Sequence, residues 1–205
     1  MGKNKERSAA EKQKRIDFYE VQREKMLAEG YREQVGVISI TKANVMAFIT
    51  AGPFALMAIV LYILKHSWIS FLFFTDSLFY FWILVLICIP IHELIHGIAW
   101  SFFCKEGWKS IGFGVMWEYL TPYCHCKEPL SFKGYICGGL APFMVLGIGG
   151  LILALINESP LLLYLSVFNI LSAGGDTTIA LMLFKHTRAK ILDHPTECGF
   201  VAFEK

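Results

Sequence analysis

Apolar residues along the chain fall into four long runs, and the charged residues are concentrated in the segments between and around them. The runs cover residues 43–64, 77–103, 134–156 and 160–184, and none of them contains Lys or Arg. Each is long enough for an α-helix to cross about 30 Å of hydrocarbon, which takes roughly 20 residues. The pattern predicts an all-α membrane protein with four transmembrane helices.

The polar segments predict the remaining elements. Residues 8–33 are rich in Glu, Lys, Arg, Gln and Ala, which favours a helix that is solvated or lies at the membrane interface. A β-favouring stretch at 111–117, followed by residues 121–126, predicts a short β-hairpin. The predicted organisation is a basic arm at 1–42, a four-span domain at 43–184 with a loop at 104–133, and a tail at 185–205.

Composition narrows the class of protein further. Hydrophobic residues make up 55% of the 205 residues and charged residues 18%, and the mean hydropathy is +0.50. These values exclude an ordinary soluble domain and a disordered chain. A net charge of +2 is too small to indicate nucleic acid as a partner. The expected surroundings are membrane lipids.

The distribution of Lys and Arg predicts how the chain is oriented. If the N-terminus lies in the cytosol, eighteen of the nineteen basic residues lie on the cytosolic side of the membrane. This asymmetry is the positive-inside signal of integral membrane proteins. We therefore expect both termini and the 104–133 loop to be cytosolic. Four of the six cysteines would then lie on the reducing side, so no disulfide framework is expected.

Residues 92–96 read His-Glu-Leu-Ile-His within the second apolar run. On a helix this H-E-x-x-H spacing places two imidazoles one turn apart on one face, with the carboxylate of Glu93 beside them. Two imidazole nitrogens suit a tetrahedral zinc site, and the glutamate can act as a base towards water. A dication also compensates for the cost of ionisable residues in a span. The motif predicts zinc on His92 and His96, with Glu93 as the catalytic residue.

Catalytic zinc sites use a third protein ligand, for which Asp176 is the strongest candidate. His92 and His96 lie twelve and eight residues before Cys104, at the cytosolic end of the second run. Asp176 lies nine residues before Lys185, at the cytosolic end of the fourth. At 1.5 Å per residue, the three side chains lie at similar depths, about 12 to 18 Å from those ends. We expect Asp176 to reach the two histidines.

Other assignments stay open at this point. Glu118, in the 104–133 loop, is a rival third ligand. Cys124, His125 and Cys126 are metal-ligating residue types, but neighbours on a strand point to opposite sides, so one ion would not easily take all three. A polar cluster that joins helices by hydrogen bonds, without metal, is the alternative to a zinc site.

Several features together resemble the site-2 protease class of intramembrane zinc metalloproteases. They are the H-E-x-x-H within a membrane helix, a Gly- and Pro-bearing span after a cytosolic hairpin, and an Asp in a later span. More narrowly, residues 92–97, 123–130 and 139–142 are similar to those of a family of small bacterial zincin peptidases. The resemblance covers about residues 77–185.

This resemblance implies a zinc-dependent intramembrane peptidase of the bacterial cytoplasmic membrane, with the ligand set and base given above. Its substrate would be a transmembrane or membrane-proximal peptide. The resemblance also implies substrate-facing positions at Gly139, Pro142 and Asn169. A substrate segment could add to the 111–117 strand, where Val115 would contact it.

Two other functions are compatible with the same motif. A zinc transporter can also carry H-E-x-x-H in a span, although four spans are few for a transport path. An inactive membrane scaffold would retain the metal for structure alone. The role of Glu93 separates these functions, because it would ligate the metal in a transporter and act as a base in a peptidase.

Overall fold

The computed structural model describes residues 2–69, 78–116 and 121–205. These residues are mostly helical, and the chain divides into two compact units. Unit 1 comprises Met1–Ile40, Glu93–Gly139 and Ile179–Lys205, and unit 2 comprises Thr41–His92 and Leu140–Thr178. Every division between the units falls inside a continuous helix. Each unit is described below by itself.

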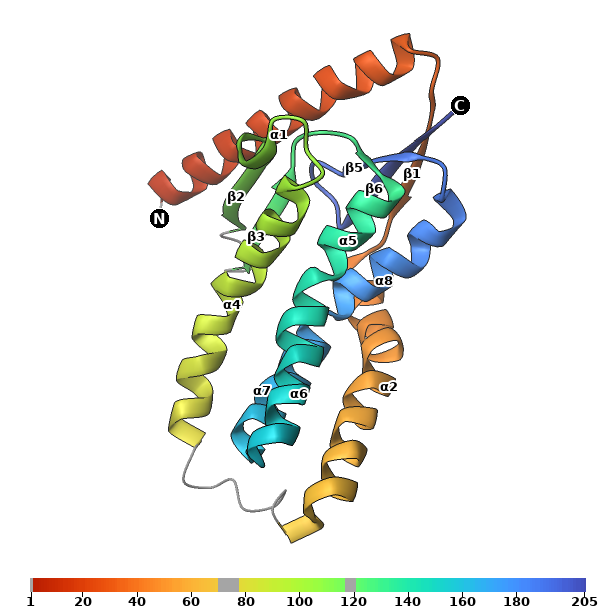
Figure 1. The fold of residues 1–205 in the computed structure, drawn as a ribbon. Helices are drawn as coiled ribbons and strands as arrows, with labels where there is room; N and C mark the ends of the chain where they lie inside the picture. The colour runs from red at the N-terminus through yellow and green to blue at the C-terminus, as the bar shows by residue number, and fades with distance from the viewer. Residues whose placement is uncertain (1, 70–77, 117–120) are drawn as a thin grey trace. The chain divides into compact units, whose positions relative to one another are not determined.

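Unit 2 is a helical bundle built around α2 (Ile40–His66), α6 (Gly149–Asn157) and α7 (Pro160–Ser172) (Figure 1). Ala51, Ala55 and Ala58 recur every three or four residues on α2, so they share one face of that helix. They are buried with Leu163 and Ile170 of α7 in one apolar core. Small side chains on α2 allow the neighbouring helices to approach closely, as is usual between membrane helices.

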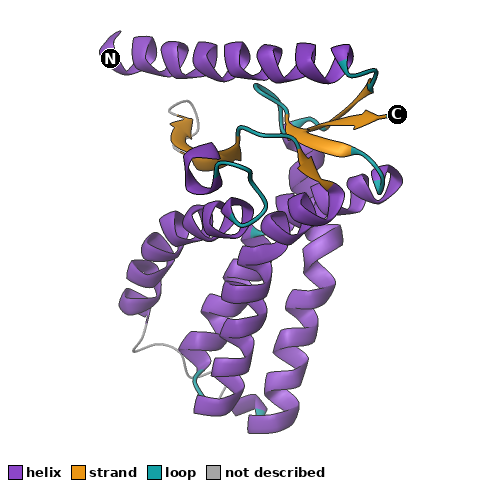
Figure 2. Ribbon diagram, turned by 45° about the horizontal axis from the view of Figure 1, so that its top comes forward, coloured by secondary structure: helices purple, strands orange, loops and turns teal. Residues whose placement is uncertain are grey.

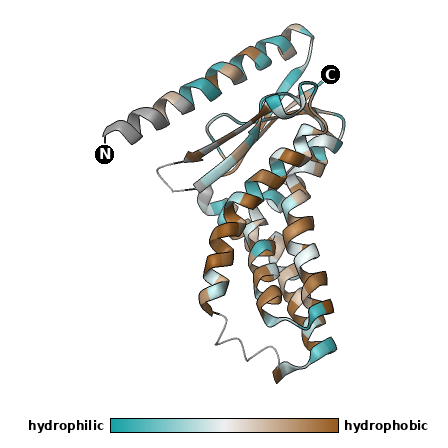
Figure 3. Ribbon diagram, turned by 60° about the vertical axis from the view of Figure 1, so that its left-hand side comes forward, coloured by the Kyte–Doolittle hydropathy of each residue, from teal (hydrophilic) through white to brown (hydrophobic). Residues whose placement is uncertain are grey.

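Three helices among the described residues are long and apolar enough to cross a membrane: Thr41–His66, Leu78–Ser101 and Phe132–Asn157. The second is α4 (Leu78–Ser101). The third runs through α5 (Phe132–Pro142), the π-helical η3 (Phe143–Ile148) and α6. Hydrophobic residues dominate these helices, whereas α1 is mainly polar (Figure 3). The first three apolar runs therefore form the helices predicted for them.

The fourth apolar run is not one straight helix. It consists of α7 and of α8 (Gly174–Leu183), which continues through η4 (Phe184–His186), and the two parts are bent by 43°. Gly174 and Gly175 are poor helix formers at the bend. A side chain on Gly174 would overlap Ala47 of α2, so glycine also allows this close contact. The break places Asp176 in the first turn of α8.

Unit 1 contains a four-stranded antiparallel sheet, which corrects the prediction of an all-α chain. The strand order is β1-β6-β5-β4. Strand β1 (Arg32–Val37) pairs with β6 (Gly199–Glu204), β6 pairs with β5 (Lys190–Asp193), and β5 pairs with β4 (Leu130–Ser131). Its strands come from the end of the predicted arm, from the central loop and from the predicted tail. Pairing across such distances along the chain leaves no local signal in the sequence.

The sheet is buried on both faces. Phe200 and Ala202 of β6 belong to a core shared with residues of α4, α5 and α8. Val201 and Phe203, which alternate with them, pack instead with Met26 of α1 (Gly2–Ala28). Figure 2 shows α1 lying along the strands of this unit. Because both faces are covered, β6 has a continuous apolar run rather than the alternating pattern of a half-exposed strand.

The predicted hairpin is present in unit 1 as β2 (Ile111–Met116) and β3 (Thr121–Cys126). The strands are antiparallel, with Ile111 opposite Cys126 and Gly112 opposite His125. Cys124 and Cys126 pack with the core that contains Ile111, whereas His125, between them, lies over Gly112 on the other face. Neighbouring residues of β3 thus point to opposite sides, as expected for a strand.

Candidate metal centre

Helix α4 carries both histidines of the H-E-x-x-H motif. It runs unbroken from Leu78 to Ser101, so His96 follows His92 by one helical turn on the same face. The division between the two units falls directly after His92, within this continuous helix. His96 is buried, with only 4% of its surface exposed.

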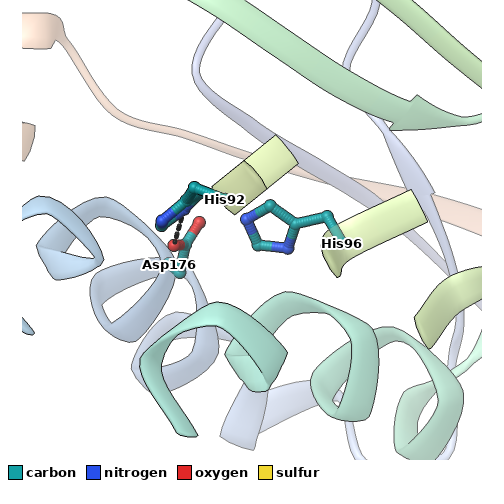
Figure 4. A group of neighbouring side chains, drawn as sticks. All are labelled: His92, His96 and Asp176. Carbon is teal, nitrogen blue, oxygen red and sulfur yellow. Dashed lines mark hydrogen bonds and ion pairs between the residues drawn. The ribbon is translucent and has the colours of Figure 1, made fainter. Parts of the chain in front are cut away.

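Asp176 approaches the motif from α8. Its Oδ2 lies 3.2 Å from Nε2 of His92, and both side chains are largely buried (Figure 4). Both residues belong to unit 2. The first turn of a helix is favourable for a carboxylate, because the backbone N–H groups there carry partial positive charge. The bend between α7 and α8 therefore places Asp176 where its charge is stabilised.

The three predicted ligands form one group. Single donor atoms of His92, His96 and Asp176 all lie within 4.8 Å of one another. Two imidazole nitrogens and one carboxylate oxygen are a donor set that zinc accepts, with a fourth position left for another ligand. Among the residues that the structure describes, no other set of three His, Cys, Asp or Glu side chains lies close enough to share an ion. Glu118, the rival third ligand, lies outside the described residues, as does residue 117 of the predicted strand.

A backbone carbonyl holds the ring of His96. Its Nδ1 lies 2.9 Å from the carbonyl oxygen of Gly138 in α5. A carbonyl only accepts, so Nδ1 must donate, and Nε2 is then the nitrogen suited to ligate a metal. In a regular helix this carbonyl would accept from the N–H of residue 142, but that residue is a proline and has none. Pro142 thus leaves the Gly138 carbonyl available to His96.

Trp100 packs against the same histidine. The two rings are stacked, with centroids 5.1 Å apart and planes 17° apart. The indole Nε1 donates to the carbonyl of Tyr135, 3.1 Å away, which anchors Trp100 to α5. A side chain on Gly138 would overlap the indole ring, so only glycine fits there. Trp100 and Gly138 were not predicted from the sequence, although Trp100 stands four residues after His96 and Gly138 four before Pro142.

Hydrogen bonds between α2 and α8 fix the turn that carries Asp176. The hydroxyl of Thr50 lies 2.8 Å from the hydroxyl of Thr177 and 3.2 Å from that of Thr178. It also lies 3.3 Å from the carbonyl oxygen of Gly174. All of these residues lie in unit 2. The cluster ties the start of α8 to α2 and so positions the residue beside it.

Cys124 and Cys126 on β3 are poorly suited to bind a metal ion. Burial raises the pKa of the Cys124 thiol on β3, and the negative charges of Glu93 and Asp193 raise it further. Burial likewise raises the pKa of Cys126. Thiolate is the form that binds metal, so these shifts disfavour both cysteines as ligands.

The four predicted substrate-facing residues are divided between the two units. Asn169 is buried in unit 2, and its side-chain amide donates to the carbonyl of Leu165 in its own helix. Pro142 is fully buried at the end of α5. Gly139 and Val115 are half-buried in unit 1, and open space surrounds the position where a side chain on Gly139 would lie.

His92, His96 and Asp176 form a group that could hold a metal ion, and a family comparison is consistent with this. Residues 83–191, more than half of the chain, match the family described as "Putative zincin peptidase". The chain belongs to this family. Membership supports a zinc metallopeptidase, with zinc as the cofactor. No curated protein and no solved structure matches the chain.

Proposed function

We propose that this protein is an intramembrane zinc peptidase, which hydrolyses a peptide bond in or near a transmembrane segment. The observation that carries the proposal is the convergence of His92, His96 and Asp176 from two apolar helices. The H-E-x-x-H motif supplies a carboxylate, Glu93, next to that group. Ionisable residues in a membrane helix are costly, and they commonly mark a functional site.

His92, His96 and Asp176 would hold the zinc ion. Their two nitrogens and one oxygen match its preferred donors, and the Gly138 carbonyl orients one of the rings. When bound, zinc supplies a Lewis acid that polarises a peptide carbonyl and makes a water molecule more acidic.

Glu93 would move the protons of the reaction. Its carboxylate takes a proton from the attacking water, whose oxygen forms the new bond to the carbonyl carbon. The same proton then passes to the departing amine nitrogen as the carbon–nitrogen bond breaks. Glu93 follows His92 directly on α4 and is half-buried, so its side chain is partly accessible.

The membrane setting follows from the apolar helices and from the charge distribution. Three helices, or four with the bent pair, fit an integral membrane protein. The positive-inside asymmetry favours cytosolic termini, and the resemblance to a bacterial family favours the cytoplasmic membrane. A substrate helix has to unwind before its backbone can reach a catalytic centre. Strand β2 offers a partner for the extended segment, and in that arrangement Val115 would contact it.

The mechanism, the ligand set and the substrate-facing roles of Gly139, Pro142 and Asn169 follow the resemblance to the site-2 protease class. Pro142 has a further role in this proposal, as a positioning residue. By lacking an N–H, it leaves the Gly138 carbonyl for His96.

Replacing Pro142 by Ala is expected to weaken zinc binding by about 10- to 100-fold, the usual effect of losing an outer partner of a metal-ligating histidine. The new N–H of residue 142 would compete with His96 for the Gly138 carbonyl. Pro53→Ala is the matched control, because Pro53 also lies inside an apolar helix, α2, which supplies no member of the metal group. Zinc affinity is measured by competition with a chelator. Equal affinities in the two variants would contradict the role given to Pro142.

The proposed function is tested by zinc removal in proteoliposomes that contain the full chain and a mixture of transmembrane peptides. New peptide termini, identified by mass spectrometry, should form with the zinc-loaded protein, disappear after chelation and return with added zinc. Termini that form equally well without zinc would refute the zinc-dependent reaction. Cleavage confined to water-soluble peptides would refute its intramembrane character.

A further inference from the structure

Unit 1 contains a cavity of about 630 Å³ that none of the metal-ligating side chains lines. Its walls are formed by α1, by the β2–β3 hairpin and by residues 192–195 at the end of β5. Figure 2 shows α1 passing over the strands of this unit. The volume lies within the range of small-molecule binding sites, about 300 to 1,000 Å³.

Much of the cavity wall is apolar and aromatic. Phe18 and Tyr19 contribute from α1, Phe113 and Tyr123 from the hairpin, and Leu192 from β5. Phe18 and Phe113 are each nearly half exposed although they are large apolar side chains. Apolar walls with a few polar groups are typical of sites that bind small ligands.

Three cations line the same cavity: Lys14, Arg15 and Lys127. In the part of the chain that the structure describes, no carboxylate forms an ion pair with any of them. Lys127 donates only to a backbone carbonyl, that of Lys109. The cavity wall therefore has an excess of positive charge.

The two carboxyl groups in the wall already have hydrogen-bond donors. Asp17 accepts from the side-chain amide of Gln13. Asp193 accepts from the hydroxyl of Tyr135 and from the backbone N–H of Cys126. Burial raises the pKa of Asp193, which favours its neutral form. Neither group offsets the cations of the cavity fully.

Two buried nitrogen atoms in this wall lack a hydrogen-bond partner. They are Nε of Arg15 and Nδ1 of His125. Every other buried side-chain nitrogen or oxygen atom of the described residues has a hydrogen-bond partner. The Arg15 guanidinium lies 4.5 Å above the ring of Tyr123. The rings of Tyr123 and His125 are 5.7 Å apart. Buried polar groups are almost always paired, so a ligand in the cavity that draws either side chain towards it would supply the missing partner.

His125 is suited to donate a hydrogen bond without adding charge. Burial lowers its pKa to about 4, and the positive charges of Arg15 and Lys127 contribute to the shift. The imidazole is therefore neutral at pH 7, with a single N–H. Gly112 lies opposite on β2, and a side chain there would overlap the imidazole, so the hairpin has room for this ring only because residue 112 is glycine.

We propose that this cavity binds the carboxyl-terminal end of a short peptide, with a free α-carboxylate and an apolar last side chain. The carboxylate accepts from Nε of Arg15 and Nδ1 of His125 once these side chains turn towards it, and the last side chain of the peptide lies against Phe18 of α1. Capture of a terminal carboxylate is an established mode of peptide recognition. The choice of a peptide rests on the proposed function, since hydrolysis of a peptide bond releases a new carboxylate.

Within unit 1, one residue of the cavity wall also contacts the helix that carries the motif. A side chain on Gly97, the residue after His96, would overlap Phe113, so α4 and the hairpin are in close contact there. Phe113 thus contacts the motif helix and also lines the cavity.

The test is isothermal titration of the full-length Glu93→Gln variant in detergent, so that no peptide is turned over. The probes are N-acetyl-Leu-Phe with a free carboxylate and its carboxyl-terminal amide. The acid is expected to bind about 10-fold or more tightly than the amide, because a charge-assisted hydrogen bond is lost in the amide. Adding Arg15→Met should reduce binding of the acid to the level of the amide.

Lys12→Met is the matched control, since Lys12 carries the same charge on α1 but is exposed and does not line the cavity. It should leave binding unchanged. His125→Phe, which keeps a ring over Gly112 and removes the donor, gives a second test that does not alter α1. Circular dichroism verifies that each variant is folded.

Three results would overturn the assignment: equal binding of acid and amide, unchanged binding in both cavity variants, or displacement of the acid by equimolar octanoate. The two proposals fail separately. Carboxylate-dependent binding without any zinc-dependent hydrolysis would contradict only the peptidase, and the reverse result would contradict only the cavity.

Discussion

Glu93→Gln is expected to slow peptide hydrolysis by about 10²- to 10⁴-fold, the usual contribution of a general acid or base, while zinc stays bound. Glutamine keeps the size and shape of the side chain, but it cannot take a proton from water. The metal-ligating group of His92, His96 and Asp176 is unchanged by the substitution. The measurements are the initial rate of cleavage in proteoliposomes and the zinc content of the same preparation.

Glu106→Gln provides the control for this variant. Glu106 is exposed just beyond the end of α4, so the same chemical change should leave hydrolysis intact. A Glu93→Gln protein that hydrolyses normally would remove Glu93 as the base. Loss of zinc from that variant would instead make Glu93 a ligand, as the transporter alternative requires.

Asp176→Ala and His92→Ala are expected to lower zinc affinity by more than 100-fold. Losing a group that only hydrogen-bonds a metal ligand lowers metal affinity about 10- to 100-fold. Asp176 and His92 supply ligating atoms themselves, so a larger loss is expected. Each change also leaves the other member of the His92–Asp176 pair, 3.2 Å apart, without that partner. Zinc affinity is measured by competition with a chromogenic chelator, and circular dichroism verifies that the helices are retained.

His66→Ala is the matched control for the histidine variant. His66 also lies in a helix of unit 2 that is apolar enough to span a membrane, and its Nε2 is 3.0 Å from the carbonyl oxygen of Leu155. It is not part of the metal-ligating group. Its replacement should leave zinc affinity unchanged. Similar losses in all three variants would mean that zinc binding reports only on general damage to the bundle.

The sequence was sufficient to predict the helices and the approach of three side chains. Membrane spans are encoded locally, because about 20 consecutive apolar residues suffice to specify one. Counting residues from the cytosolic ends predicted that His92, His96 and Asp176 would meet, and the structure brings them within 4.8 Å. The bend before Asp176 was not predicted, because glycines are common in membrane helices and do not by themselves show where a helix breaks.

The sheet and the surroundings of His96 could not be derived in this way. Strand β1 pairs with β6, so that Arg32 lies opposite Glu204. These residues are far apart in the sequence, and no local pattern predicts that they pair. The hydrogen bond from His96 to Gly138 likewise joins two helices. Pro142 was predicted as a substrate-facing residue, whereas its missing N–H gives it a structural role that becomes apparent only when α4 and α5 are seen together.

X-ray absorption at the zinc edge of the wild-type protein reports the atoms that surround the ion. Zinc held by His92, His96 and Asp176 should show only nitrogen and oxygen neighbours at about 2.0 to 2.2 Å, with imidazole scattering. Asp176→Ala should bind no zinc under the same conditions. Sulfur neighbours at about 2.3 Å in the wild type, from cysteines such as Cys124 or Cys126, would contradict the site.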